Sequence, residues 1–180
     1  LDKGQPDKAI VDFSKAINLE PNGPTTYGDY YNRGRAHFAN GDLEKALEDY
    51  DHAIKLKPDF SDAYGNRCNV YLSKREFDRG VADCSRSIAL DPMKAGAYNN
   101  RGAALASQGL FSRAMSDFQR ALKLDPQNPL VHLNIGLAYK DQKKIDKAIA
   151  QFRKVIQMGR DEEAVTSAKL ELCALAREQC

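Results

Sequence analysis

The sequence has no tryptophan and is poor in the residues that most often hold metals or form cross-links. Its 180 residues include three histidines and four cysteines. The histidines lie far from one another and from any cysteine, so they offer no metal-ligand pair. The cysteines are too sparse for a disulfide scaffold, and the glycines occur singly, which excludes a phosphate-binding loop. We therefore expect no metal, no cofactor and no enzymatic activity.

An excess of charge of one sign and long apolar runs are also absent. The 27 Lys and Arg residues stand against 25 Asp and Glu residues, a formal net charge of +2. This balance argues against a nucleic-acid-binding surface. Even the longest apolar runs, such as residues 103–106, are short, so no membrane insertion is expected. With 42% apolar and 29% charged residues, the composition is that of a globular protein.

The N-terminal end begins at Leu1 inside a polar, turn-like stretch. We expect a processed chain or a fragment, so the missing signal peptide does not indicate a compartment. The cytoplasm is favoured, and an exported or periplasmic location stays open.

A repeat of 34 residues organises the chain. Pro58, Pro92 and Pro126 are spaced by this interval, each after a short apolar segment, and Pro21 ends an earlier copy. Four full repeats follow at residues 27–60, 61–94, 95–128 and 129–162, called repeats 1 to 4 below. Residues 1–23 are expected to be the second helix of a truncated repeat, and residues 163–180 form a tail. Such self-similarity is typical of stacked-repeat folds.

Each repeat has two stretches with helical spacing of its apolar residues. In repeat 3 the first contains Tyr98 and Leu105, and the second runs from Phe111 and ends before Asp125-Pro126. Every repeat is therefore predicted to be a helix–turn–helix hairpin. One hairpin cannot bury both of its faces, so neighbouring hairpins must stack.

Small and large residues alternate at fixed places of the repeats. The eighth place holds Gly34, Cys68, Gly102 and Gly136, and the twentieth holds Ala46, Gly80, Ala114 and Ala148. The twenty-fourth place holds Tyr50, Cys84, Phe118 and Phe152. A glycine inside a helix costs about 1 kcal/mol relative to alanine, so its recurrence indicates close contact between helices. Tyr50, Phe118 and Phe152 are predicted to be buried there.

The pattern resembles the tetratricopeptide repeat, whose consensus has aromatic residues, Leu-Gly, Ala, Phe and Pro at these offsets. The resemblance implies an all-α fold, a right-handed superhelical solenoid of antiparallel helix hairpins in one continuous domain. It also implies a protein-binding function. Two departures are an arginine before the small eighth residue in three repeats and Gly159-Arg160 where repeat 4 lacks the proline.

The arginines at the seventh place change together with an aspartate sixteen residues later. Arg33, Arg67 and Arg101 accompany Asp49, Asp83 and Asp117, whereas repeat 4 has Ile135 and Gln151. A half-buried guanidinium needs a carboxylate partner, so we predict an Arg–Asp pair inside each hairpin. The rival geometry pairs each arginine with the aspartate of the preceding repeat, and an anion-binding site is a further alternative.

Cys68 and Cys84 occupy facing places of repeat 2. They are interpreted as two buried thiols that act as small apolar residues. A disulfide between the two helices, which would indicate an oxidising compartment, stays open as the alternative. His132 stands at an aromatic place and is interpreted as a core substitute for tyrosine.

The sixth place is asparagine in all four repeats: Asn32, Asn66, Asn100 and Asn134. Asparagine is a mediocre helix residue, and its carboxamide can donate to and accept from peptide groups. In the resembled family the first helices line a concave groove into which this place faces. The resemblance therefore implies a peptide groove lined also by Tyr31, Arg35, Asn69, Asn99 and Leu133. The alternative is that these asparagines bond a neighbouring helix.

The tail has an amphipathic pattern and is predicted to be a helix that caps the last hairpin. A helix that forms a dimer is the alternative, and the leucines at the C-terminal end of the groove are expected either to contact the cap or to line a pocket.

The preferred function is a protein-interaction scaffold for an extended peptide or protein segment. A self-assembling homo-oligomer and a targeting domain of a larger enzyme are the alternatives.

Overall fold

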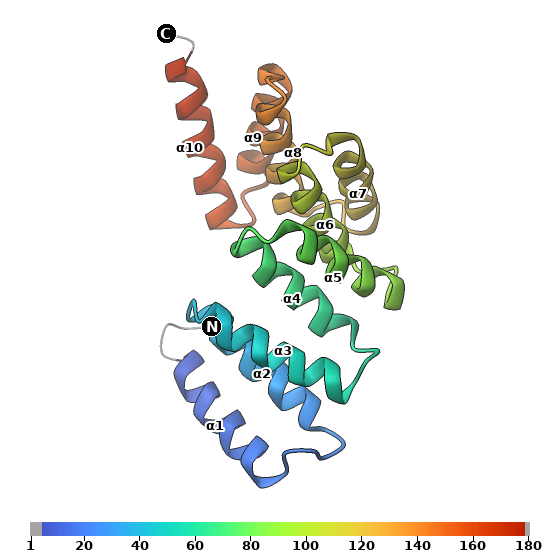
Figure 1. The fold of residues 1–180 in the computed structure, drawn as a ribbon. Coiled ribbons are helices and arrows are strands. Elements are labelled where there is room, and N and C mark those ends of the chain that lie inside the picture. Colours follow the sequence, from blue (N-terminus) through green and yellow to red (C-terminus); the bar gives the residue numbers. More distant parts are fainter. Residues whose placement is uncertain (1–4, 179–180) are drawn as a thin grey trace. The chain divides into compact units, whose positions relative to one another are not determined.

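The computed structural model describes residues 5–178, and it places ten helices there (Figure 1). They are α1 Gln5–Leu19, α2 Thr26–Ala39, α3 Leu43–Leu56, α4 Ser61–Ser73, α5 Phe77–Leu90, α6 Ala95–Ser107, α7 Phe111–Leu124, α8 Pro129–Asp141, α9 Ile145–Met158 and α10 Glu162–Glu178. Residues 1–4, at the expected truncation, and Cys180 lie outside this range. No strand occurs between residues 5 and 178, and the all-α prediction is confirmed.

The contacts within the chain divide it into two compact units, Leu1–Pro92 and Met93–Cys180. The N-terminal unit contains α1 to α5, and the C-terminal unit contains α6 to α10. The repeat pattern predicts one continuous domain. In a repeat fold each hairpin contacts only its neighbours, so the contacts are concentrated within groups of adjacent hairpins.

Each hairpin turn contains a residue in the left-handed region at the same place of the repeat. Gly41 and Gly109 have φ of 82° and 76°, and Arg75 and Lys143 have φ of 61° and 59°. Glycine adopts this conformation without steric cost, whereas Arg75 and Lys143 keep it because the hairpin geometry demands it.

Within the described residues, no helix is both long and apolar enough to cross a membrane.

The glycines at the eighth place let an aromatic ring approach the backbone of the first helix. A Cβ added to Gly102 would lie 2.7 Å from the ring of Phe118, and one added to Gly136 would lie 2.5 Å from Phe152. Tyr50 is 1% exposed, and Phe118 and Phe152 are fully buried, which confirms the predicted core. The ring fills the space that the missing side chain leaves, so glycine and aromatic residue form one packing unit.

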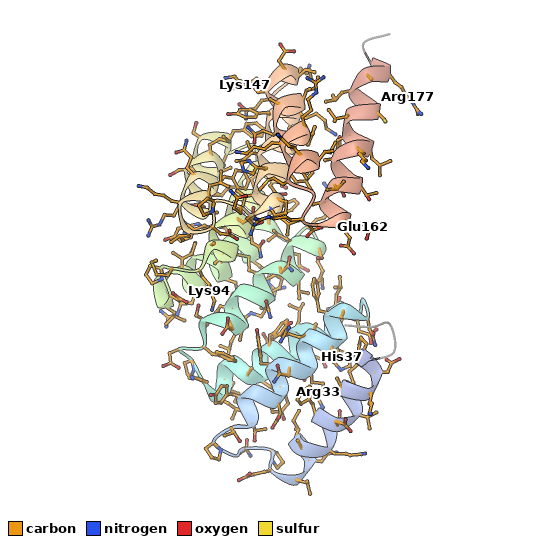
Figure 2. All side chains as sticks on the ribbon, turned by 180° about the vertical axis from the view of Figure 1, so that it is seen from behind. Arg33, His37, Lys94, Lys147, Glu162 and Arg177 are labelled. Atoms are coloured by element: carbon orange, nitrogen blue, oxygen red, sulfur yellow. A yellow bond between two sulfur atoms is a disulfide. The ribbon has the colours of Figure 1, made fainter. Side chains whose placement is uncertain are left out.

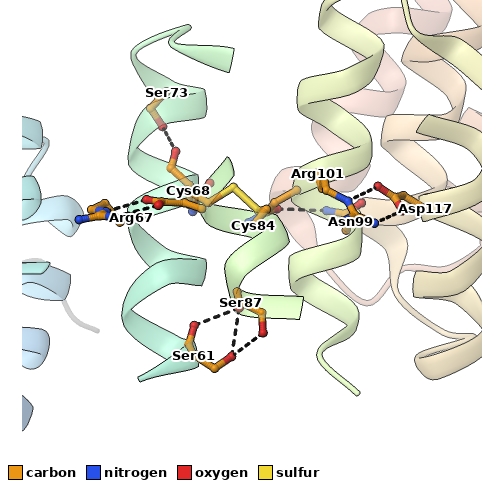
Figure 3. The surroundings of a disulfide bond; sticks show 12 residues. Ser61, Arg67, Cys68, Ser73, Cys84, Ser87, Asn99, Arg101 and Asp117 are labelled. Atoms are coloured by element: carbon orange, nitrogen blue, oxygen red, sulfur yellow. Dashed lines mark hydrogen bonds and ion pairs between the residues drawn. A yellow bond between two sulfur atoms is a disulfide. The ribbon is translucent and has the colours of Figure 1, made fainter. Parts of the chain in front are cut away.

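Repeat 2 replaces this unit with a disulfide bond (Figure 3). Cys68 of α4 and Cys84 of α5 are bonded, their Cα atoms lie 5.4 Å apart, and both side chains are fully buried. The interpretation of these residues as two thiols is therefore wrong, and the alternative that stayed open is the one observed. The bond occupies the same facing places that hold glycine and a ring in the other repeats.

Three repeats contain the predicted ion pair inside the hairpin. Nε and Nη2 of the arginine donate over 2.9 and 2.6 Å in Arg33–Asp49, 2.6 and 2.8 Å in Arg67–Asp83, and 2.7 and 2.8 Å in Arg101–Asp117. The prediction is confirmed, and the rival pairing of Arg67 with Asp49 and of Arg101 with Asp83 is wrong. Arg67 also donates from Nη1 to Oδ1 of Asp51 in the preceding repeat. A guanidinium also lies over a tyrosine ring in each repeat, at 5.5 Å for Tyr30, 5.5 Å for Tyr64 and 5.8 Å for Tyr98. The hydrogen bond to Asp117 raises the pKa of Arg101 above its ordinary value.

Replacing Asp117 with alanine is expected to lower the free energy of unfolding by about 2–3 kcal/mol, because the half-buried guanidinium of Arg101 loses its carboxylate. The paired change Arg101→Ile and Asp117→Gln installs the residues of repeat 4 and is expected to cost less. Urea denaturation followed by circular dichroism compares the two variants. A paired variant less stable than the single one would contradict this account.

Repeat 4 exchanges the tyrosine, arginine and aspartate together. His132 takes the place of the tyrosine, and its Nδ1 lies 2.9 Å from Oε1 of Gln151. His132 is 4% exposed, as expected for a core substitute, and burial lowers its pKa while the bond to Gln151 opposes that shift. Ile135 is also buried, so the two helices of repeat 4 pack together without an Arg–Asp ion pair.

Helix α10 covers the last hairpin of the C-terminal unit. Ala164, Ala168 and Leu175 are buried in one cluster with Phe152 and Val155 of α9. The Nζ atom of Lys140 in α8 lies 2.6 Å from Oε2 of Glu171, which links α8 to the cap. Glu162 and Arg177 lie near opposite ends of this helix (Figure 2). Helix α10 therefore packs against repeat 4, and its role as a cap stays a prediction.

Candidate functional site

In the N-terminal unit, the first helices of repeats 1 and 2 form the α2/α4 face, defined here by Tyr31, Asn32, Arg35, Asn66 and Asn69. Arg33 and His37 lie along the same helix α2 (Figure 2), but both turn toward the hairpin interior, where Asp49 pairs with Arg33. Asn32, Asn66 and Asn69 are half-buried, and Arg35 is exposed. Polar side chains of the predicted set are thus accessible on this face.

A hydrogen bond connects the two helices of the α2/α4 face. Nδ2 of Asn66 donates to the hydroxyl of Tyr31 over 3.1 Å. The Tyr31 ring packs against Phe60 with centroids 4.9 Å apart, and the guanidinium of Arg35 lies 5.8 Å from its centre. Burial, followed by repulsion from Asp62, raises the pKa of Tyr31. The Tyr31 hydroxyl therefore stays protonated at neutral pH and holds the Asn66 carboxamide in place.

The C-terminal unit has a corresponding α6/α8 face with Asn99, Asn100, Leu133 and Asn134. Nδ2 of Asn134 donates to Oδ1 of Asn99 over 3.0 Å, and Nδ2 of Asn99 lies 3.5 Å from Oδ1 of Asn100. Asn99 is only 7% exposed, whereas Asn100 and Asn134 are half-buried. Asn99 thus holds the side chains of Asn134 and Asn100 by hydrogen bonds, and its own burial closes it to a ligand.

Leu133 is half-buried and packs against the core cluster of α9 and α10. Leu133 therefore packs against a cluster to which α10 contributes. The sequence allowed either a contact of the leucines with the cap or a pocket lined by them, and for Leu133 the first is the one favoured. Its neighbour Leu130 is 43% exposed.

The bonds of Asn66 and Asn134 follow one rule that the sequence reasoning missed. Each of these two sixth-place carboxamides donates to the fifth-place residue of the preceding repeat, 35 residues earlier. The signal was present, because Tyr31 and Asn99 are the fifth-place residues with polar side chains long enough to accept. The alternative of a bond to a neighbouring helix therefore holds for these two asparagines, and each keeps further hydrogen-bonding capacity, since a carboxamide has two N–H donors and an acceptor oxygen.

The three histidines have separate surroundings. His37 lies beside Asp42 and Asp49, His52 stacks on Tyr30, and His132 bonds Gln151. Among residues 5–178 no three metal-ligating side chains come together.

The fold and the repeated hairpins define the class of helical-repeat proteins that act as interaction scaffolds. Three family models, all described as tetratricopeptide repeat, match residues 29–60, 69–134 and 105–172. The chain is a tetratricopeptide repeat protein. Proteins of this family bind proteins and peptides, and they are typically not enzymes.

Curated relatives share only short segments with the chain. Tetratricopeptide repeat protein 6 of Homo sapiens is 35% identical over 77 residues, which are 43% of this chain and 14% of that protein. A tetratricopeptide repeat and J domain-containing co-chaperone of Cryptococcus neoformans is 29% identical over 77 residues, with the same shares. A photosystem I assembly protein of Rippkaea orientalis is 34% identical over 68 residues, 38% of this chain and 39% of that protein. The match spans less than half of each of these relatives.

Solved structures match nearly the whole chain. A thermophilic tetratricopeptide repeat protein of Thermus thermophilus superimposes with a TM-score of 0.78, 19% identity, and coverage of 94% of this chain and 92% of that one. The MamA protein of Desulfovibrio magneticus has a TM-score of 0.74 and 24% identity, covering 89% of each chain. These likenesses establish the tetratricopeptide repeat solenoid as the fold class.

Proposed function

We propose that this protein is a scaffold that binds extended segments of partner proteins, with the α2/α4 face as the contact surface of one unit and the α6/α8 face as that of the other. Each face is built from the first helices of adjacent repeats, so its side chains recur at a regular interval. An extended peptide presents its own N–H and C=O groups at regular intervals, and it can therefore be held by a repeated donor and acceptor.

The observation that carries the proposal is the asparagine at the sixth place of every repeat, half-buried in all four cases. A carboxamide that served only to join helices gains from full burial, because water competes for its hydrogen bonds. The bonds of Asn66 to Tyr31 and of Asn134 to Asn99 leave each side chain fixed in orientation and still accessible. Pre-ordered side chains lose less entropy when a ligand binds.

The other predicted residues support the proposal unequally. Arg35 and Asn69 are accessible on the α2/α4 face, and in the described part of the chain the Asn69 carboxamide has no hydrogen-bond partner. Tyr31 and Asn99 accept hydrogen bonds from Asn66 and Asn134, so we assign to them the role of orienting these two asparagines. We therefore assign ligand contact to the asparagines of the sixth place, with Arg35 and Asn69 beside them.

The double change Asn66→Ala and Asn100→Ala is expected to weaken peptide binding about 5- to 150-fold, because each lost hydrogen bond contributes about 0.5–1.5 kcal/mol. A peptide selected on the wild-type protein from a random library serves as the probe, and its affinity is measured by isothermal titration calorimetry.

The matched control for this test is Lys55→Glu, an exposed change on the second-helix side, which is expected to leave the affinity nearly unchanged. The opposite ranking, with Lys55→Glu abolishing binding and the asparagine changes silent, would place the partner on the other side and leave the asparagines a structural role.

Self-assembly is a second candidate, favoured by one observation. The side of α10 that faces away from the core exposes Leu170 at 67%, next to the exposed Cys173. Light scattering distinguishes the two candidates, because a stable mass of a single chain contradicts self-assembly.

A further inference from the structure

The α6/α8 face contains a pocket within the C-terminal unit. Its volume is about 210 Å³, and it is lined by Ala103, Ala106, Ser107, Asn134, Leu137, Ala138, Lys140 and Asp141. The sixth-place residue Asn134 is one of these residues, so the pocket opens directly beside the proposed peptide contact. Alanine and leucine side chains form one part of its wall, and the other part is polar.

The side chains at the equivalent places of the α2/α4 face are larger. By repeat register, Ala103, Ala106 and Ala138 correspond to Arg35, Phe38 and Val70. Phe38 packs against the core cluster that contains Val70 and Tyr71 of α4. Three side chains of the lining are thus smaller in the C-terminal unit, while the helices that frame the pocket belong to the same kind of hairpin.

The size and lining of the pocket define what fits it. A cavity of about 150 Å³ is large enough to hold a benzene molecule, so a pocket of about 210 Å³ has room for a Leu, Met or Phe side chain. Burying such a side chain against alanine and leucine removes apolar surface from water. Asn134 lines the same pocket, so its carboxamide is available to the peptide group of the residue that enters it.

The charges at the pocket favour a basic neighbour for that side chain. Of the two charged residues in the lining, Lys140 is neutralised by Glu171 at 2.6 Å. Asp141 is exposed and has no ion pair within residues 5–178. The lining also includes the last residues of α6 and α8, and helix C-termini carry partial negative charge.

We propose that this pocket is the specificity site of the peptide-binding face, and that it takes a partner segment with a Leu, Met or Phe side chain adjacent to Lys or Arg. The proposal rests on the proposed function, because the asparagines hold the backbone of the same segment. It adds the class of sequence that the protein selects.

The test uses the whole chain with carbon-13-labelled alanine methyl groups and nitrogen-15-labelled asparagine side chains, observed by NMR. The probe is a capped decapeptide of Gly and Ser with a central Leu-Lys, and the matched probes carry Ala-Lys or Leu-Glu. With Leu-Lys, we expect shifts at the methyl groups of Ala103, Ala106 and Ala138 and none at the buried Ala46. Exchanging Leu for Ala is expected to weaken binding about 10- to 50-fold, and exchanging Lys for Glu about 2- to 5-fold.

Two variants make the test specific. Ala106→Phe introduces the residue that repeat 1 has at this place, so the fold is expected to persist, with an unchanged circular dichroism spectrum, while the preference for Leu over Ala disappears. Asp141→Asn is expected to keep the Leu preference and to lose the preference for Lys over Glu.

Three results would overturn the proposal. If the asparagine signals respond equally to Leu-Lys and Ala-Lys while the pocket methyl groups stay silent, the pocket is not used and the proposed function stands. If no peptide moves either set of signals at millimolar concentration, both are wrong. If dilution of the protein alone moves the pocket methyl groups and light scattering shows a doubled mass, a second copy of the chain occupies the pocket.

Discussion

Replacing Phe118 with alanine is expected to lower the free energy of unfolding by about 3–5 kcal/mol, as is typical when a buried ring is removed. Phe118 is fully buried, and its ring contacts the place where Gly102 lacks a side chain. One wall of that space is the backbone of α6 at Gly102, which has no side chain to move into it. The loss would be a large part of the stability of a typical domain.

Urea denaturation followed by circular dichroism measures this change. Met93→Ala is the control, because Met93 is 68% exposed and its removal is expected to shift the midpoint little. An unchanged midpoint for Phe118→Ala would show that stacked hairpins packed through a glycine and a ring do not stabilise this protein.

Removing the disulfide is expected to cost about 3 kcal/mol, because the bond closes a short loop and restricts the unfolded chain. Cys68 and Cys84 are separated by 16 residues, and each is fully buried. A reducing agent is therefore expected to lower the unfolding midpoint of the wild-type protein, and Cys68→Ala with Cys84→Ala is expected to lower it without the agent.

The repeats themselves provide a sharper variant. Cys68→Gly with Cys84→Phe installs the glycine and ring of repeats 3 and 4, and it is expected to be more stable than the double alanine variant and insensitive to reductant. Cys173→Ser, at the exposed free cysteine, is the control and keeps the response to reductant. A wild-type midpoint that is the same with and without reductant would contradict a stabilising cross-link.

The proposed binding residues depend partly on repeat register and partly on contacts between helices. Register places an asparagine at the same point of α2, α4, α6 and α8 and predicts that it is accessible. The partners of these asparagines depend on the fifth-place residue of the helix alongside. Tyr31 and Asn99 accept these hydrogen bonds from asparagines 35 residues later in the chain, a pairing that no pattern within a single helix reveals.

The sequence by itself determined the ten-helix pattern in its essentials, because helix periodicity and turn residues act over a few positions and recur with the repeat. It also determined the Arg–Asp pairs, since the joint replacement by Ile135 and Gln151 in repeat 4 linked residues on different helices. Only the tertiary structure decided that Cys68 and Cys84 are bonded, that Asn99 is buried, and that Ala103 and Ala106 leave a pocket beside Asn134. These features depend on how far apart two helices lie and on which side chains fill the space between them, and that distance is set by packing across the whole hairpin.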